Sequence, residues 1–139
     1  MFRKILLPVD LSERHQPALD TAADLAGPTG GEITLLHVIE VIPGLPMEED
    51  MAFYHRLEKA ARKHLNQLAA LLRQRNVARH AEILYGPRGP KIVQYAQEKG
   101  MDVIVLTAPR FDPNHVGVSW GSLSYKVSVL APCPVLLVK

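Results

Sequence analysis

Short runs of apolar residues alternate with longer segments of helical periodicity along this chain. Leu57, Ala61, Leu65, Leu68 and Leu72 recur at spacings of three and four, which predicts an amphipathic helix over 51–76. The apolar runs are short and continuous, as in strands buried on both faces of a parallel sheet. They predict five strands, over 5–9, 33–39, 81–85, 103–106 and 134–138.

Strands that alternate with helices of ten or more residues indicate an α/β fold, an open parallel sheet with helices on both faces. Three further helices are expected: one ended by the glycine-rich turn 27–31, one between the turn 86–90 and Gly100, and one over 120–130. Because crossovers are right-handed, the simplest strand order is 3-2-1-4-5, a Rossmann-like arrangement. The 139 residues fit a single domain over 1–139.

Ligands of such sheets bind beyond the carboxyl ends of the strands, where the strand order reverses. In the order 3-2-1-4-5 this point lies between the first and fourth strands. Two loops follow the strands at this point, one that begins at Asp10 and one that runs from Thr107 to Ser122. We therefore expect a ligand cleft between these loops.

Composition and charge exclude several classes of function. The net charge of +2 is small, and the basic face of the long helix lacks interleaved aromatic residues, so no nucleic-acid partner is expected. No apolar run reaches the roughly 18 residues of a membrane helix, and 1–7 is interpreted as a strand rather than a signal peptide. The single cysteine, Cys133, suits a reducing cytoplasm.

Neither a metal site nor a catalytic site is predicted. The six histidines show no paired metal-ligand spacing, and no nucleophile and base stand together in the sequence. The adenylate-forming and ATP-pyrophosphatase folds share this topology, but their loop motifs are absent from 10–15. We therefore expect a protein that is not an enzyme.

Four segments together resemble the universal stress protein family, and they cover nearly the whole chain in order. They are 4–12, 35–38, 101–105 and the ending 121–138. The resemblance implies the same five-stranded fold, a cytoplasmic role in stress tolerance and frequent dimerisation. It also implies a site for AMP, ADP or ATP, with Mg²⁺, because many members bind adenine nucleotides.

The family's contacts can be carried over at four positions. Asp10 matches the acidic residue near the adenosine, and Val38 matches the residue whose backbone contacts adenine. Gly121 and Ser122 match the phosphate ligands at the start of the last helix. The resemblance thus implies that the adenosine half of the site is present.

The phosphate half departs from the family pattern of Gly, two residues, Gly, nine residues, then Gly and Ser or Thr. We match the two leading glycines to Leu106 and Pro109, and eleven residues then precede Gly121. Proline has no amide hydrogen to donate to a phosphate, and Leu106 is unfavourable at the positive φ that glycine permits. Thr107 and Arg110 are the remaining candidates for contacts in this degenerate loop.

The leading hypothesis is a non-enzymatic regulatory or protective protein that binds an adenine nucleotide weakly. The alternative is a nucleotide-free module that binds an unidentified protein partner, and a slow ATPase is a lesser alternative. The last strand is expected at a sheet edge, and such an apolar edge needs a partner. We predict a homodimer through Val135, Leu136, Leu137 and Val138.

Overall fold

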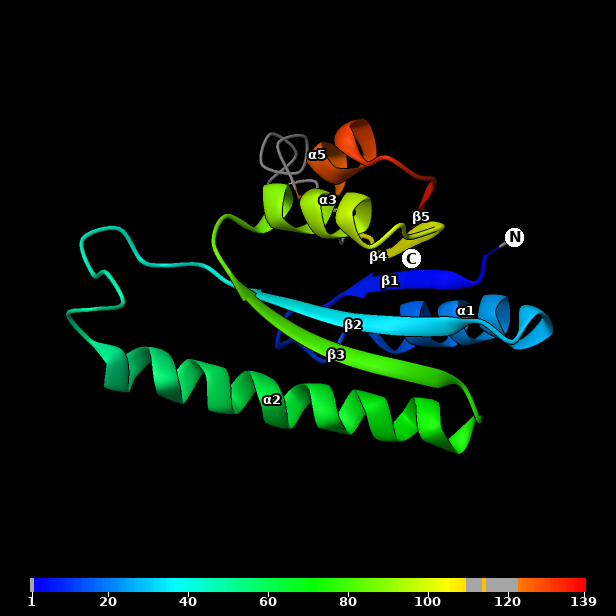
Figure 1. Ribbon diagram of the computed structural model, residues 1–139, viewed down its shortest axis with the longest axis horizontal. Coiled ribbons are helices and arrows are strands. Elements are labelled where there is room, and N and C mark those ends of the chain that lie inside the picture. Colours follow the sequence, from blue (N-terminus) through cyan, green and yellow to red (C-terminus); the bar gives the residue numbers. More distant parts are fainter. Residues whose placement is uncertain (1, 110–113, 115–122) are drawn as a thin grey trace.

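The computed structural model describes residues 2–109, 114 and 123–139. It contains a five-stranded sheet of order β3-β2-β1-β4-β5, in which every neighbouring pair is parallel (Figure 1). The predicted α/β class and strand order are confirmed. The strands are β1 (Lys4–Pro8), β2 (Glu32–Ile39), β3 (Ala78–Tyr85), β4 (Val103–Thr107) and β5 (Val135–Val138).

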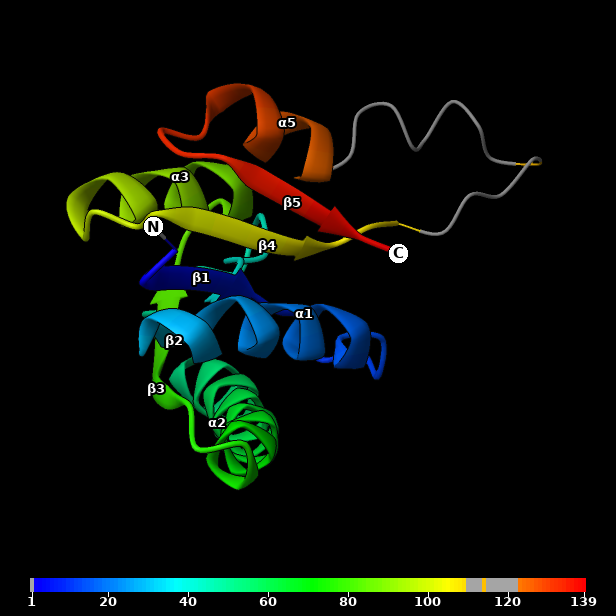
Figure 2. The same ribbon diagram turned by 90° about the vertical axis from the view of Figure 1, so that its right-hand side faces the viewer.

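Helices cover both faces of this sheet (Figure 2). The described helices are α1 (Gln16–Ala26), the short 3-10 helix η1 (Gly27–Thr29), α2 (Met51–Gln74), α3 (Arg88–Glu98) and α5 (Leu123–Leu130). Side chains of α1 and α2 belong to one apolar cluster, and those of α3 and α5 to the other. Successive strand residues alternate between the clusters, so that Ile5 and Leu7 join the first and Leu6 joins the second.

The long helix α2 shows how the apolar spacing produces this packing. The carboxylate of Asp50 caps its first turn by accepting a hydrogen bond of 3.0 Å from the Phe53 amide. Four of the predicted apolar positions are buried, but Leu57 is only half-buried. Tyr54, one turn earlier, is buried in addition to them. Full burial of such large side chains contributes about 1.5–3 kcal/mol each.

Several predicted boundaries differ from the structure by one to three residues. β3 begins at Ala78 rather than 81, because its first three residues pair with β2 although Arg79 and His80 are polar. α3 begins at Arg88, inside the predicted turn, because a proline is tolerated in the first turn of a helix, where its missing amide is not needed. β4 extends to Thr107, which pairs with Val138 of β5.

Candidate functional site

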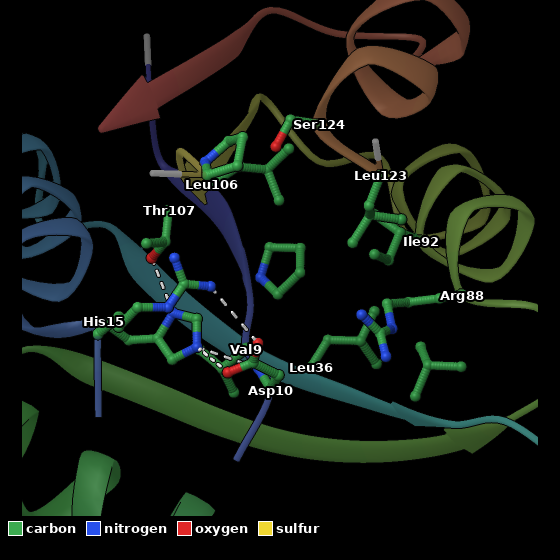
Figure 3. A pocket seen from close by; sticks show the side chains of 14 residues that line it. Val9, Asp10, His15, Leu36, Arg88, Ile92, Leu106, Thr107, Leu123 and Ser124 are labelled. Atoms are coloured by element: carbon green, nitrogen blue, oxygen red, sulfur yellow. Dashed lines mark hydrogen bonds and ion pairs between the residues drawn. The ribbon is translucent and has the colours of Figure 1, made fainter. Parts of the chain in front are cut away.

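A cavity of about 140 Å³ lies beyond the carboxyl ends of β1, β2 and β4, against the first turns of α3 and α5 (Figure 3). This is the edge of the sheet where the strand order predicts a cleft. Three of the residues predicted from the sequence, Asp10, Val38 and Thr107, line it. They come from the ends of three strands that are far apart in the chain.

The floor of the cavity is apolar. Val9, Leu36 and Leu106 come from the strands or just after them, while Ile92 and Leu123 come from α3 and α5. Leu36, Ile92 and Leu106 belong to the second apolar cluster, and Leu123 packs against it. Val9 belongs to the first apolar cluster. The floor therefore suits an uncharged, flat or aliphatic group.

The opposite end of the cavity is polar and is organised by His15. Its Nδ1 atom lies 2.7 Å from the Thr107 hydroxyl, and its Nε2 atom lies 2.7 Å from a carboxylate oxygen of Asp10 (Figure 3). His15 is only 5% exposed and is the N-cap residue of α1. Asp10 directly follows Val9 after β1, and Thr107 ends β4. The arrangement joins an acid, an imidazole and an alcohol in one row.

Asp10 is held in its ionised form. Burial by itself would raise the pKa of this carboxyl, but hydrogen bonds from Ser12 and His15 outweigh that effect and hold it well below its usual range. The Ser12 amide donates to the Asp10 carboxylate at 2.8 Å. Two groups of Asp10 meet Nε2: the backbone amide donates to it at 3.1 Å, and the ionised carboxylate lies at 2.7 Å. The carboxylate contact is shorter and involves a full charge, so we assign the imidazole proton to Nε2. A neutral His15 ring therefore accepts at Nδ1 from the Thr107 hydroxyl.

Two arginines flank the cavity. The guanidinium of Arg14 lies 3.8 Å from the second carboxylate oxygen of Asp10, on the polar side. Arg88, the first residue of α3, lies 3.5 Å from Glu40 and projects toward the floor from the other side (Figure 3). Both side chains are more than a third exposed, so each guanidinium remains accessible to an anionic ligand.

The position matched to the first glycine of the phosphate loop lies within a strand. Leu106 belongs to β4, as the strand prediction 103–106 has it, pairs with Leu137 and is 4% exposed, so it is a core residue at the floor of the cavity. The strand is one residue longer than predicted, and the connection to α5 begins at Ala108. A match shifted by one residue would place the two glycines at Thr107 and Arg110, so neither register has a glycine there. The loop is degenerate in both.

Three other predicted site residues, Arg110, Gly121 and Ser122, lie outside the described residues. The described part of α5 begins at Leu123, directly after them. Their assignment as phosphate contacts stays a prediction.

Sequence reasoning missed His15 and both arginines. No nucleophile and base stood together in the sequence, because His15 and Thr107 are 92 residues apart. The spacing of five residues between Asp10 and His15 has no periodicity that marks a site. Only the pairing of β1 with β4 brings the ends of these strands together.

Among the residues that the structure describes, no group of three or more His, Cys, Asp or Glu side chains could hold a metal ion. Within the same residues, no helix has both the length and the apolar character that crossing a membrane requires.

Comparison with known proteins establishes the family. The family model described as "Universal stress protein family" matches residues 1–139. A universal stress protein from Thermus aquaticus is 34% identical over 144 residues, which is 100% of both chains. The chain therefore belongs to the universal stress protein family.

Solved structures agree with this assignment. Universal stress protein UspA from Lactobacillus plantarum superposes with a TM-score of 0.81 at 26% identity, covering 100% of this chain and 99% of that chain. A universal stress protein from Archaeoglobus fulgidus, solved in complex with dAMP, has a TM-score of 0.73 at 21% identity and covers 100% of both chains. Two further relatives of this fold, 18% and 19% identical with TM-scores of 0.70 and 0.71, were solved with cAMP and with AMP.

Proposed function

We propose that this protein is a non-enzymatic stress-response protein that binds an adenine nucleotide weakly in the cavity beyond β1 and β4. The observation that carries the proposal is the convergence of Asp10, Val38 and Thr107 on one cavity at the strand-order reversal. Relatives of the same fold that were solved with AMP, dAMP and cAMP support an adenine nucleotide as the ligand class. Stress response is the role that membership of the family suggests.

The base would occupy the apolar floor near the end of β2. Val38 is 4% exposed, so its backbone rather than its side chain is the natural contact for the edge of a base. The cavity of about 140 Å³ is smaller than the roughly 300–1,000 Å³ of typical small-molecule sites. A whole nucleotide would therefore extend out of the cavity, past Asp10 and Thr107.

Weak binding follows from the degenerate phosphate loop. Pro109 lines the cavity but has no amide hydrogen to offer to a phosphate oxygen. Each lost charge-assisted hydrogen bond costs about 1.5–3 kcal/mol, so two losses would move a micromolar site to roughly the millimolar range. The outer phosphates lose more hydrogen bonds than the rest of the nucleotide. AMP or ADP should therefore bind no worse than ATP. Arg110, Gly121 and Ser122 are proposed as the remaining phosphate contacts.

Titration calorimetry with AMP, ADP and ATP, each with and without Mg²⁺, tests this function. Ser124→Phe should abolish binding, because Ser124 lines the cavity at the start of α5. Ser128→Phe is the matched control, since Ser128 lies one turn later on the exposed surface of the same helix. A sub-micromolar ATP affinity would contradict weak binding, and binding that persists in Ser124→Phe would place the nucleotide elsewhere.

A homodimer through β5 completes the proposal. β5 is an edge strand, and the side chains of Leu136 and Leu137 are 39% and 42% exposed. Pairing two copies of Val135–Val138 across a two-fold axis would satisfy the free edge and bury these leucines. A cytoplasmic location belongs to the same proposal and suits the free thiol of Cys133.

The second candidate is a nucleotide-free module that binds another protein, and the loss of both leading glycines favours it. The two candidates differ in what the purified protein carries. Absorbance of a released nucleotide after denaturation supports the first, and its absence together with no heat of binding supports the second. Slow ATP hydrolysis would appear as phosphate release that Ser124→Phe abolishes.

A further inference from the structure

The polar end of the cavity has the composition of a nucleophilic site. A hydroxyl, an imidazole and an ionised carboxylate stand in one row, with 2.7 Å between Thr107 Oγ1 and His15 Nδ1 and 2.7 Å between His15 Nε2 and Asp10 Oδ1. A nucleophile hydrogen-bonded to a base that a third group orients is the arrangement used for covalent catalysis on unrelated folds. Such a row is not needed to bind a nucleotide.

We propose that Thr107 is a nucleophile that accepts the acyl group of small acyl phosphates, with His15 as its base and Asp10 as the residue that positions His15. With the ring proton assigned to Nε2 beside Asp10, the Thr107 hydroxyl donates its proton to His15 Nδ1. The lone pairs of Thr107 Oγ1 are therefore directed away from the ring. Thr107 lines the cavity, so these lone pairs can meet a bound electrophile.

The walls of the cavity indicate the class of electrophile. The apolar floor, which includes Leu36, Ile92 and Leu106, accepts a short acyl group and matches the small volume of about 140 Å³. The guanidinium groups of Arg14 and Arg88 lie at the edges of the same cavity and favour an anionic leaving group. A mixed anhydride of a short carboxylic acid and phosphoric acid carries both features in one small molecule.

The step balances without a further reactant. Thr107 Oγ1 forms a bond to the carbonyl carbon while its proton passes to His15 Nδ1. The bond between that carbon and the bridging phosphate oxygen breaks, and inorganic phosphate leaves with the electron pair. The imidazolium is stabilised by the Asp10 carboxylate until it returns its proton to the departing phosphate or to water. The products are an O-acyl-threonine and inorganic phosphate.

Acetyl phosphate is the probe, and intact-mass and peptide mass spectrometry are the readouts. We expect acetylation of Thr107, together with phosphate release, in the wild-type chain and in Thr107→Ser, and none at residue 107 in Thr107→Val. His15→Gln keeps an amide that can hydrogen-bond both neighbours but cannot take the proton. Its rate should fall on the order of 10²-fold, the usual effect of a general base. Asp10→Asn should lower the rate as well and shift its pH dependence.

Chemical acetylation of exposed lysines such as Lys59 and Lys126 serves as the internal reference. It shows that the reagent is active in every variant, and circular dichroism shows that each variant is folded. Three results would overturn the proposal: a phosphoryl group on Thr107 instead of an acetyl group, a His15→Gln rate equal to that of the wild type, or no acetyl adduct at Thr107 in the wild-type chain. None of these results depends on whether a nucleotide binds.

Discussion

The imidazole of His15 and the hydroxyl of Thr107 lie 2.7 Å apart, although 92 residues separate them in the chain. The contact joins the first turn of α1 to the end of β4, across the carboxyl end of β1. It fixes the ring of a buried histidine and leaves its other nitrogen beside Asp10. The same contact therefore serves the stability of the fold and defines the polar end of the cavity.

His15→Ala should destabilise the protein by about 1–3 kcal/mol, because it removes the partner of both Asp10 and Thr107 in a region that is mostly buried. Urea unfolding followed by circular dichroism measures the change. His55→Ala is the control, since His55 is exposed on α2 and should shift the midpoint little. Equal effects of the two variants would mean that the His15 contacts add nothing to stability.

Asp10 should make stability depend on acid pH. Its folded pKa is lower than the unfolded value of about 3.9, so its contribution is fully present above that value and is lost as the pH falls toward the folded pKa. The stability difference between the wild type and Asp10→Asn should therefore be constant near neutral pH and shrink below about pH 4. Denaturant unfolding at a series of pH values measures it, and a difference that does not change with pH would contradict the prediction.

The Tyr54 hydroxyl should hold the connection between β2 and α2 in a single conformation. Its ring is buried, and its hydroxyl accepts from the Ile42 amide at 2.9 Å and donates to the Leu45 carbonyl. Tyr54→Phe removes both bonds, so hydrogen exchange of the Ile42 amide should become faster while global stability falls by only about 1 kcal/mol. Tyr85→Phe, which removes a hydroxyl bonded to Glu58 instead, should leave that amide unchanged.

Leu137→Lys should convert the proposed dimer into monomers, because two copies of the charge would face each other at the paired β5 edges. Light scattering at tens of micromolar gives the mass directly. Leu11→Lys is the matched control, since Leu11 is similarly exposed at 43% but follows β1. A wild-type mass of 15.4 kDa would exclude the dimer, and a dimer that survives Leu137→Lys would place the interface elsewhere.

Much of the architecture could be predicted from local patterns in the sequence. Continuous apolar runs such as Ile5–Leu7 mark strands buried on both faces, and the spacing of Leu65, Leu68 and Leu72 marks the buried face of α2. These signals are local because the spacing of buried residues along the chain follows the periodicity of the helix or strand in which they lie. Because crossovers between parallel strands are right-handed, only a few strand orders were possible, and the simplest of them is the one in the structure.

The boundaries were harder to predict, because the pairing of a strand with its neighbour depends on residues elsewhere in the chain. Thr107 belongs to β4 because it pairs with Val138, and Ala78 belongs to β3 because it pairs with Glu32. Neither residue is part of an apolar run. Leu106 was correctly predicted to lie in this strand, but the family pattern also matched it to a glycine of the phosphate loop, although it is a core residue.

The sequence by itself determined the α/β class, the strand order and the edge of the sheet where the cavity lies, because periodicity and handedness are properties of single elements and their connections. Only the tertiary structure decided that His15 stands between Asp10 and Thr107. Hydrogen bonds of this kind depend on positions in space to within a fraction of an ångström. Those positions are set by the packing of α1 against β1 and β4, and no local pattern along the chain records them.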